Sequence, residues 1–145
     1  MALLAAGLAL IAVMAGCASS YKPKLVETRR LVLFCDRELN AGQKLPVDIV
    51  YVPLRESLVA VTQVSVADWF EKDKRAAWPH LKAVSVSGLA PERMELKITP
   101  PAETQAIVIR ANYLNVKGPE GLQLILDGSA KEEEIIFVTG KGLLR

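Results

Sequence analysis

Pro46-Val-Asp-Ile-Val-Tyr-Val52 is a run of β-branched and aromatic residues that follows a turn-rich segment. It predicts a strand with Val47, Ile49 and Tyr51 on one face, because side chains alternate between the two faces of a strand. Pro46 suits the first position of such a strand, where the ladder needs no backbone donor. The run therefore indicates a strand that packs against a core.

The same criteria predict further strands on both sides of this run. They are Arg30–Cys35, Lys82–Ser87, Arg93–Thr99, Gln105–Leu114, Leu122–Asp127 and Glu134–Thr139. Ala106-Ile-Val-Ile109 is apolar throughout, which is typical of a strand in the centre of a sheet. Ile107 and Ile109 should share one buried face there, with Val108 covered on the other. Gly140-Lys141-Gly142 is interpreted as a turn.

One helix is predicted between the strands. Ser65 is placed to cap its start, and Pro79 ends it. The apolar stripe expected to face the core consists of Val66, Trp69, Phe70 and Ala77. Leu58–Val64, just before this helix, is compatible with an extra strand or with a loop. Trp69 and Trp78 are nine residues apart, so on one helix they would face opposite sides; Trp78 suits either an exposed interface or a cover for one end of the domain.

Short, closely spaced strands with one inserted helix favour a mainly β fold, a two-sheet β-sandwich. We assign residues 29–145 to this sandwich domain, residues 17–28 to a lipidated cysteine and its polar tether, and residues 1–16 to a signal peptide.

The N-terminal assignment depends on an apolar segment followed by a cysteine. Met1 to Gly16 contain no charged side chain, and the run from Ala2 to Ala15 is shorter than the ~20 residues that cross a bilayer. Met14-Ala-Gly-Cys17 resembles a lipobox, in which Cys17 carries lipid and becomes the first residue of the mature protein. The alternative is an ordinary cleaved signal followed by a chance cysteine. With Cys17 lipidated, Cys35 has no disulfide partner and is interpreted as a buried apolar residue.

The sequence contains no motif typical of a catalytic, metal-binding or nucleic-acid-binding site. The formal net charge of +2 is too weak and dispersed to indicate nucleic-acid binding. His80 is the single histidine, so an ordinary zinc site is not expected, and no calcium-binding cluster or phosphate-binding glycine loop occurs. Glu132-Glu-Glu134 is interpreted as a solvated strand entry. We therefore expect no metal, no cofactor and no enzymatic activity, although catalytic groups can converge from distant positions.

Three motifs resemble the outer-membrane lipoprotein of type VI secretion systems, the TssJ (SciN) family. Leu39-Asn-Ala-Gly-Gln-Lys-Leu-Pro-Val-Asp-Ile-Val-Tyr51 is similar to the family's first loop and second strand. Ser65-Val-Ala-Asp-Trp-Phe70 is similar to the start of its helix, and Val108-Ile-Arg-Ala-Asn-Tyr113 to a later strand. The tryptophan that usually follows that later strand is replaced by Gly118-Pro-Glu-Gly121.

The resemblance implies a transthyretin-like sandwich that is not an enzyme. It implies a lipid anchor in the outer membrane, with the domain on the periplasmic face, and a protein partner, the periplasmic part of a TssM-like inner-membrane protein. The partner-binding loop would be Asp36 to Lys44. Its expected exposed tip consists of Asn40, Ala41, Gly42, Gln43 and Lys44. A plain hairpin connection is the other interpretation of this loop, and a periplasmic module that binds a small ligand or glycan is the alternative function.

Replacing Cys17 tests the anchor. Two or more acyl chains hold a protein stably on a membrane, whereas one chain binds only reversibly. Cys17→Ser should give a soluble or uncleaved protein that a palmitate analogue does not label, measured by metabolic labelling and membrane fractionation. Labelled Cys17→Ser protein would contradict the assignment.

Overall fold

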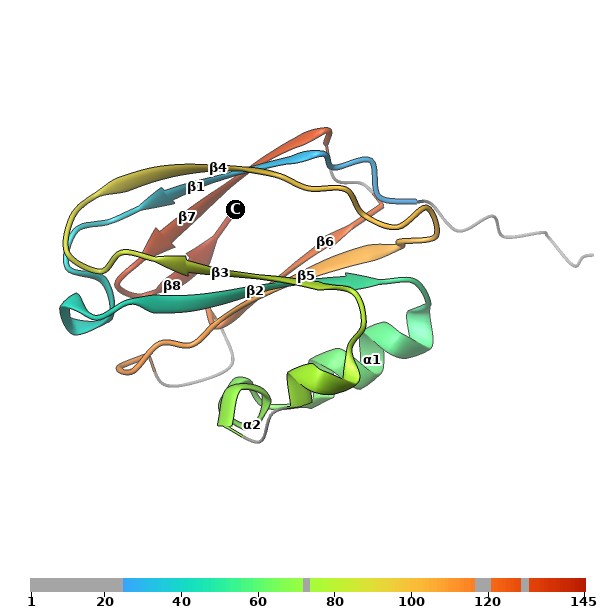
Figure 1. Ribbon diagram of the computed structural model, residues 1–145, viewed down its shortest axis with the longest axis horizontal. Helices are drawn as coiled ribbons and strands as arrows, with labels where there is room; N and C mark the ends of the chain where they lie inside the picture. Colours follow the sequence, from blue (N-terminus) through green and yellow to red (C-terminus); the bar gives the residue numbers. More distant parts are fainter. Residues whose placement is uncertain (1–24, 72–73, 117–120, 129–130) are drawn as a thin grey trace, which may run out of the picture.

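The computed structural model describes residues 25–71, 74–116, 121–128 and 131–145. Two four-stranded sheets pack face to face, as a mainly β sandwich (Figure 1). The first sheet contains, in spatial order, β4 (Glu92–Lys97), β1 (Arg30–Cys35), β7 (Glu133–Thr139) and β8 (Gly142–Leu144). The second contains β3 (Leu81–Val86), β2 (Leu45–Val52), β5 (Ala106–Ala111) and β6 (Gln123–Asp127). The predicted fold class and all seven predicted strands are confirmed, while β8 was not predicted.

The register places apolar side chains of the two sheets in a common core. Within the first sheet, Leu33 pairs with Met94 across an antiparallel ladder and with Ile136 across a parallel one. Ile49 pairs with Ile109 at the centre of the second sheet. The predicted inner face of β2 is confirmed, because its members are buried in the core between the sheets. They are Val47, Ile49 and Tyr51.

Strands β2 and β5 are buried on both faces. Ile107 and Ile109 lie in the core between the sheets, as predicted. Val108, on the opposite face of β5, belongs to a second apolar layer between the second sheet and the helices. A strand apolar on both faces is stable only where a further layer covers it. Here the helical insert, the segment between β2 and β3, supplies that layer (Figure 1).

The helical insert contains more than the single predicted helix. Ser65 caps α2 (Val66–Glu71) as expected, since its Oγ accepts a hydrogen bond from the Asp68 amide at 3.0 Å. The stretch left open as strand or loop is mostly helix α1 (Arg55–Gln63), so both of those alternatives are wrong. Leu58 and Val61, three residues apart, share the face that packs on the second sheet. Helical spacing of these apolar residues outweighed the β-branched composition.

The two tryptophans contact each other, so the prediction that they face opposite sides is wrong. Their ring centroids are 6.3 Å apart. Because α2 ends at Glu71 and a separate 3₁₀ turn, η2 (Lys74–Ala77), precedes Trp78, the periodicity of α2 does not extend to Trp78. Trp69 is fully buried and Trp78 half-buried against the same apolar layer. Ala77 is exposed and lies beyond the end of α2, so its predicted place in the apolar stripe is wrong.

Packing at the start of the described chain and at its C-terminal end is more extensive than predicted. Val26 and Thr28 are already buried, ahead of the predicted domain start at residue 29. Glu134 is also buried, so the prediction of a solvated strand entry is wrong for this residue. Its carboxylate accepts hydrogen bonds from the Arg145 guanidinium at 2.8 and 3.0 Å and from the Lys131 amide at 2.8 Å. These contacts attach the last residue of the chain to the first sheet.

Cys35 is a buried free thiol, as predicted. Burial, with smaller contributions from Glu92 and Asp36, raises the pKa of the Cys35 thiol to about 11. The thiolate is the reactive form of cysteine, so burial keeps Cys35 in the less reactive thiol form at neutral pH.

Truncating the centre of β5 should destabilise the sandwich strongly. Ile107→Ala or Ile109→Ala should lower the free energy of unfolding by ~2–5 kcal/mol in urea titrations, because each removes a fully buried side chain. Ile125→Ala is the matched control on β6, where the side chain is 40% exposed and the expected loss is below ~1 kcal/mol. Equal losses at the three positions would contradict a central position for β5.

Candidate functional site

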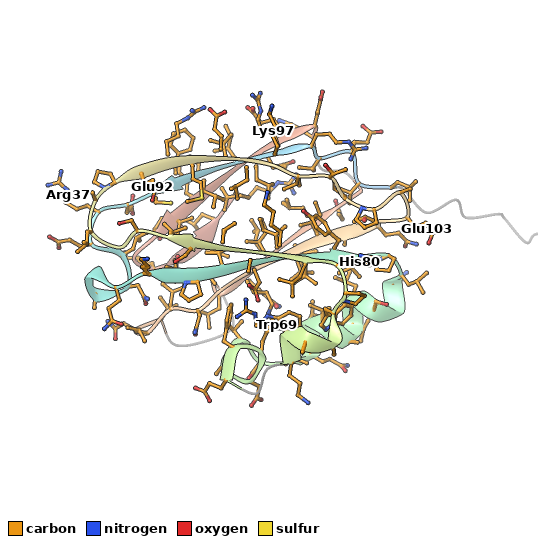
Figure 2. All side chains as sticks on the ribbon, viewed as in Figure 1. Arg37, Trp69, His80, Glu92, Lys97 and Glu103 are labelled. Atoms are coloured by element: carbon orange, nitrogen blue, oxygen red, sulfur yellow. The ribbon has the colours of Figure 1, made fainter. Side chains whose placement is uncertain are left out.

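The predicted partner-binding loop lies at one end of the sandwich. It joins β1 to β2 and contains the 3₁₀ turn η1 (Leu39–Gly42). Figure 2 shows Arg37, from this loop, at the opposite end from Glu103 and from the start of the described chain. Four of the five predicted tip residues are exposed or half-buried. They are Ala41, Gly42, Gln43 and Lys44.

Asn40 is buried, so the expectation that it is exposed is wrong. Only 7% of Asn40 is accessible, and its side chain joins two loops. Its Nδ2 donates to the Lys44 carbonyl at 3.1 Å, and its Oδ1 accepts from the Leu114 amide, after β5, at 2.6 Å. Its own carbonyl accepts from the Gln43 amide at 3.1 Å. Asn40 therefore shapes the loop from inside and presents no side chain to a partner.

The backbone of this loop is left-handed over consecutive residues. Asn40, Ala41 and Gly42 have φ angles of 51°, 54° and 76°, and Glu38 has a φ of 60°. For a residue with a Cβ this conformation costs ~1–2 kcal/mol, and Asn tolerates it better than most. Such a conformation persists only where surrounding contacts impose it.

Gly88 supplies one of those contacts from the turn between β3 and β4. A Cβ on Gly88 would lie 2.1 Å from the Gln43 carbonyl oxygen and 2.5 Å from that of Leu39. Only glycine therefore lets these two backbones approach so closely. Asn40 and Gly88 together join three loops into one surface, although they are far apart in sequence.

A buried polar cluster lies on the other side of the second sheet, beneath the helical insert. Asp48 of β2 is fully buried and accepts from Trp69 Nε1 at 2.8 Å. Arg75, half-exposed in η2, donates to both carboxylate oxygens of Asp48, at 2.8 and 3.0 Å. Trp69 and Arg75 thus hold the Asp48 carboxylate in place and connect α2 and η2 to the sheet.

Arg110 of β5 completes this cluster. Its guanidinium donates to the carbonyls of Val61, at 2.9 Å, and Val64, at the C-terminal end of α1. It also lies 4.9 Å from the centroid of the Trp69 ring. Burial lowers the pKa of Arg110 to about 10, opposed by the charge of Asp48, so the side chain stays protonated at neutral pH. A cation at a helix C-terminus satisfies free carbonyls and interacts favourably with the helix dipole.

An open cleft of about 300 Å³ lies at the opposite end from the β1–β2 loop. It is lined by Tyr51, Pro53, His80, Pro101, Ala102, Glu103 and Thr104. Tyr51 and the His80 imidazole are the two aromatic rings in this lining. Among the described residues, no group of three His, Cys, Asp or Glu side chains could bind a metal ion.

Cys17 and the rest of residues 1–24 lie outside the described residues. Within the described ranges, no helix is long and apolar enough to cross a membrane.

The sequence matches no family model and no curated protein, whereas the fold matches solved structures. Lip of Serratia marcescens, described as a membrane-bound component of the type VI secretion system, aligns with 80% of this chain and 96% of its own, at a TM-score of 0.55 and 14% identity. The type VI lipoprotein TssJ1 of Pseudomonas aeruginosa aligns over 80% and 93%, at a TM-score of 0.57 and 14% identity. This chain has the fold of the type VI secretion lipoproteins.

A third match comes from a structure described as the type VI protein TssM, C-terminal domain (869–1107), from EAEC. It covers 81% of this chain and 98% of the matched chain, at a TM-score of 0.60 and 16% identity. Because 98% of the matched chain aligns with 81% of this protein, the matched chain is about as long as the aligned part of this protein. It is therefore about half as long as the range 869–1107.

Substituting Asn40 should destabilise the loop in two separable ways. Asn40→Ala should lower the free energy of unfolding by about 2–4 kcal/mol, because it removes buried hydrogen bonds and places alanine at a left-handed position. Asn40→Gly should cost roughly 1 kcal/mol less, since glycine tolerates positive φ. Gln43→Ala, an exposed neighbour, is the control, with an expected change under ~0.5 kcal/mol in denaturant unfolding. A cost no larger for Asn40→Ala than for Gln43→Ala would contradict this role.

Proposed function

We propose that this protein is a lipid-anchored component of a type VI secretion membrane complex. In this proposal Cys17 attaches it to the periplasmic face of the outer membrane, and the sandwich binds the periplasmic domain of a TssM-like inner-membrane protein. The observation that carries the proposal is the shared fold: the sandwich aligns over nearly the full length of two type VI lipoproteins. The lipobox-like Met14–Cys17 directly ahead of the sandwich supports the same assignment.

The geometry of the chain supports a division between an anchored end and a binding end. Seven residues separate Cys17 from Leu25, so the sandwich would stay within about 30 Å of its anchor. The described chain begins at the end of the sandwich opposite the β1–β2 loop (Figure 2). The loop from Asp36 to Lys44 is therefore free to contact a partner on the side away from the anchor. Loops carried on a rigid scaffold are common binding elements.

A non-enzymatic role is consistent with the charged side chains of the described core. Asp48 and Arg110, the most deeply buried of these, bind helices and backbone carbonyls. The similar solved structures are described as lipoproteins and secretion components.

The alternative, a binding module for a small ligand or glycan, would use the cleft beside Tyr51. Proline and alanine make up three of its seven lining residues, and sugar binding usually needs more aromatic surface. The structure therefore favours the partner-binding proposal.

Changing the exposed loop side chains tests the proposed contact. The triple variant Ala41→Ser, Gln43→Ala, Lys44→Ser should weaken binding to the TssM-like periplasmic domain at least tenfold, roughly 1.4 kcal/mol, in titration calorimetry. Asn40 and Gly42 are left unchanged because they fix the backbone.

The matched control changes the same residue types at exposed positions of the helical insert: Ala60→Ser, Gln63→Ala, Lys74→Ser. It should bind like the parent. Unchanged affinity of the loop variant would move the contact elsewhere, and failure of the parent to bind would count against the proposed function.

A further inference from the structure

Two highly exposed leucines flank the β1–β2 loop. Leu89, in the turn between β3 and β4, is 74% exposed, the largest fraction among the large apolar side chains of the described residues. Leu114, after β5, is 56% exposed. Exposed single leucines are common, but apolar side chains gathered around one loop indicate a contact surface.

Both leucines are positioned by the contacts that shape the loop. The Leu89 Cδ2 atom lies 3.4 Å from where a Cβ on Gly42 would be. Its neighbour Gly88 contacts the backbone of the same loop. The Leu114 amide donates to Asn40 Oδ1 at 2.6 Å. The two side chains therefore project from backbones that are already fixed against the loop.

The exposed charges of the β1–β2 loop, which contacts the backbones of both leucine-bearing loops, balance one another. Asp36 and Glu38 are exposed anions of the loop, and Arg37 and Lys44 are exposed cations. A surface with balanced charge has no strong preference for an acidic or a basic partner. Its apolar side chains then supply the main driving force for association.

Position in the molecule indicates what covers this surface. The loops face away from the end at which the chain enters the sandwich, and so away from the expected lipid anchor (Figure 1). A surface at the far end of a lipid-anchored domain cannot rest on the anchoring membrane. A protein reaching across the periplasm can approach it freely.

We propose that Leu89 and Leu114, with the loop from Leu39 to Gln43 between them, form one preorganised apolar docking surface for the periplasmic domain of the TssM-like partner. This proposal rests on the proposed function and identifies the residues that carry its affinity. The partner surface that fits is an apolar recess that takes up both leucines, with polar groups around it for Gln43 and Lys44. Because Asn40 and Gly88 fix the three loops beforehand, little ordering is needed on binding.

The test compares two double variants of the full-length lipoprotein, purified in detergent and titrated against the solubilised TssM-like protein. Leu89→Ser with Leu114→Ser should weaken binding at least thirtyfold. The matched control, Leu54→Ser with Leu144→Ser, changes leucines that are 53% and 56% exposed elsewhere on the sandwich. It should change affinity less than threefold. Raising the salt concentration from 50 to 500 mM (about tenfold) should change the parent affinity less than fivefold.

Each outcome separates the two proposals. A parent lipoprotein that does not bind the partner would overturn the proposed function and this surface with it. A parent that binds, while the Leu89/Leu114 variant binds within threefold of it, would overturn the docking surface alone, and so would an equal loss in the control.

If the serine variant melts more than 5 °C below the parent, Leu114→Lys replaces it, with the same expected loss of affinity. Leu89→Met should retain binding, because it keeps an apolar side chain of similar volume.

Discussion

The apolar character of β2 and β5 on both faces is the constraint on which the architecture depends. One face of each strand forms the core between the sheets, and the other face would be exposed if the sandwich were only two layers. Val50, Val52 and Val108 on that outer face need a cover, and α1 with α2 provides it. The first sheet carries alternating charged residues on its edge strand β4, and no described helix covers its outer face, where Ile135 and Phe137 of β7 are 43% and 47% exposed (Figure 1). The fold is therefore a sandwich with a third, helical layer on one side only.

The buried pair of opposite charges fixes where that third layer docks. Asp48 and Arg110 are directly paired in the register of β2 and β5, on the face that the helices cover. Burying charges is costly, and hydrogen bonds to the charged groups offset that cost. Asp48 obtains donors from Trp69 and Arg75, and Arg110 finds acceptors at the end of α1. An insert placed one turn away would leave these charges without partners, so the cluster selects one position for the helices.

The sequence predicted the strands well because their signals are local. Alternation, apolar runs and Gly/Pro breaks identified seven strands, and the inner faces of β2 and β5 followed from period-two spacing. Predictions failed where contacts between residues far apart in sequence determine the local structure. Helix α1 was obscured by its β-branched residues, Trp78 contacts Trp69 only because the chain turns after α2, and Asn40 is buried by a hydrogen bond to Leu114. One usable signal was overlooked: Asp48 and Arg110 are lone opposite charges within apolar strands, as expected for a buried pair.

The loop end shows the same dependence on long-range contacts, with a functional consequence. Ser87-Gly-Leu-Ala-Pro91 is visibly a turn in the sequence, but nothing local indicates that Gly88 contacts the Leu39–Gln43 backbone. A left-handed segment held by Asn40 and Gly88 cannot relax without separating three loops, so its shape is set before any partner arrives. In the proposed function a short tether restrains the protein to a membrane surface, and a rigid binding end would offset part of the ordering cost of each encounter. The proposed docking surface gives the backbone strain and the exposed leucines at this end one physical explanation, because it would be kept ready for a partner on the side away from the proposed anchor.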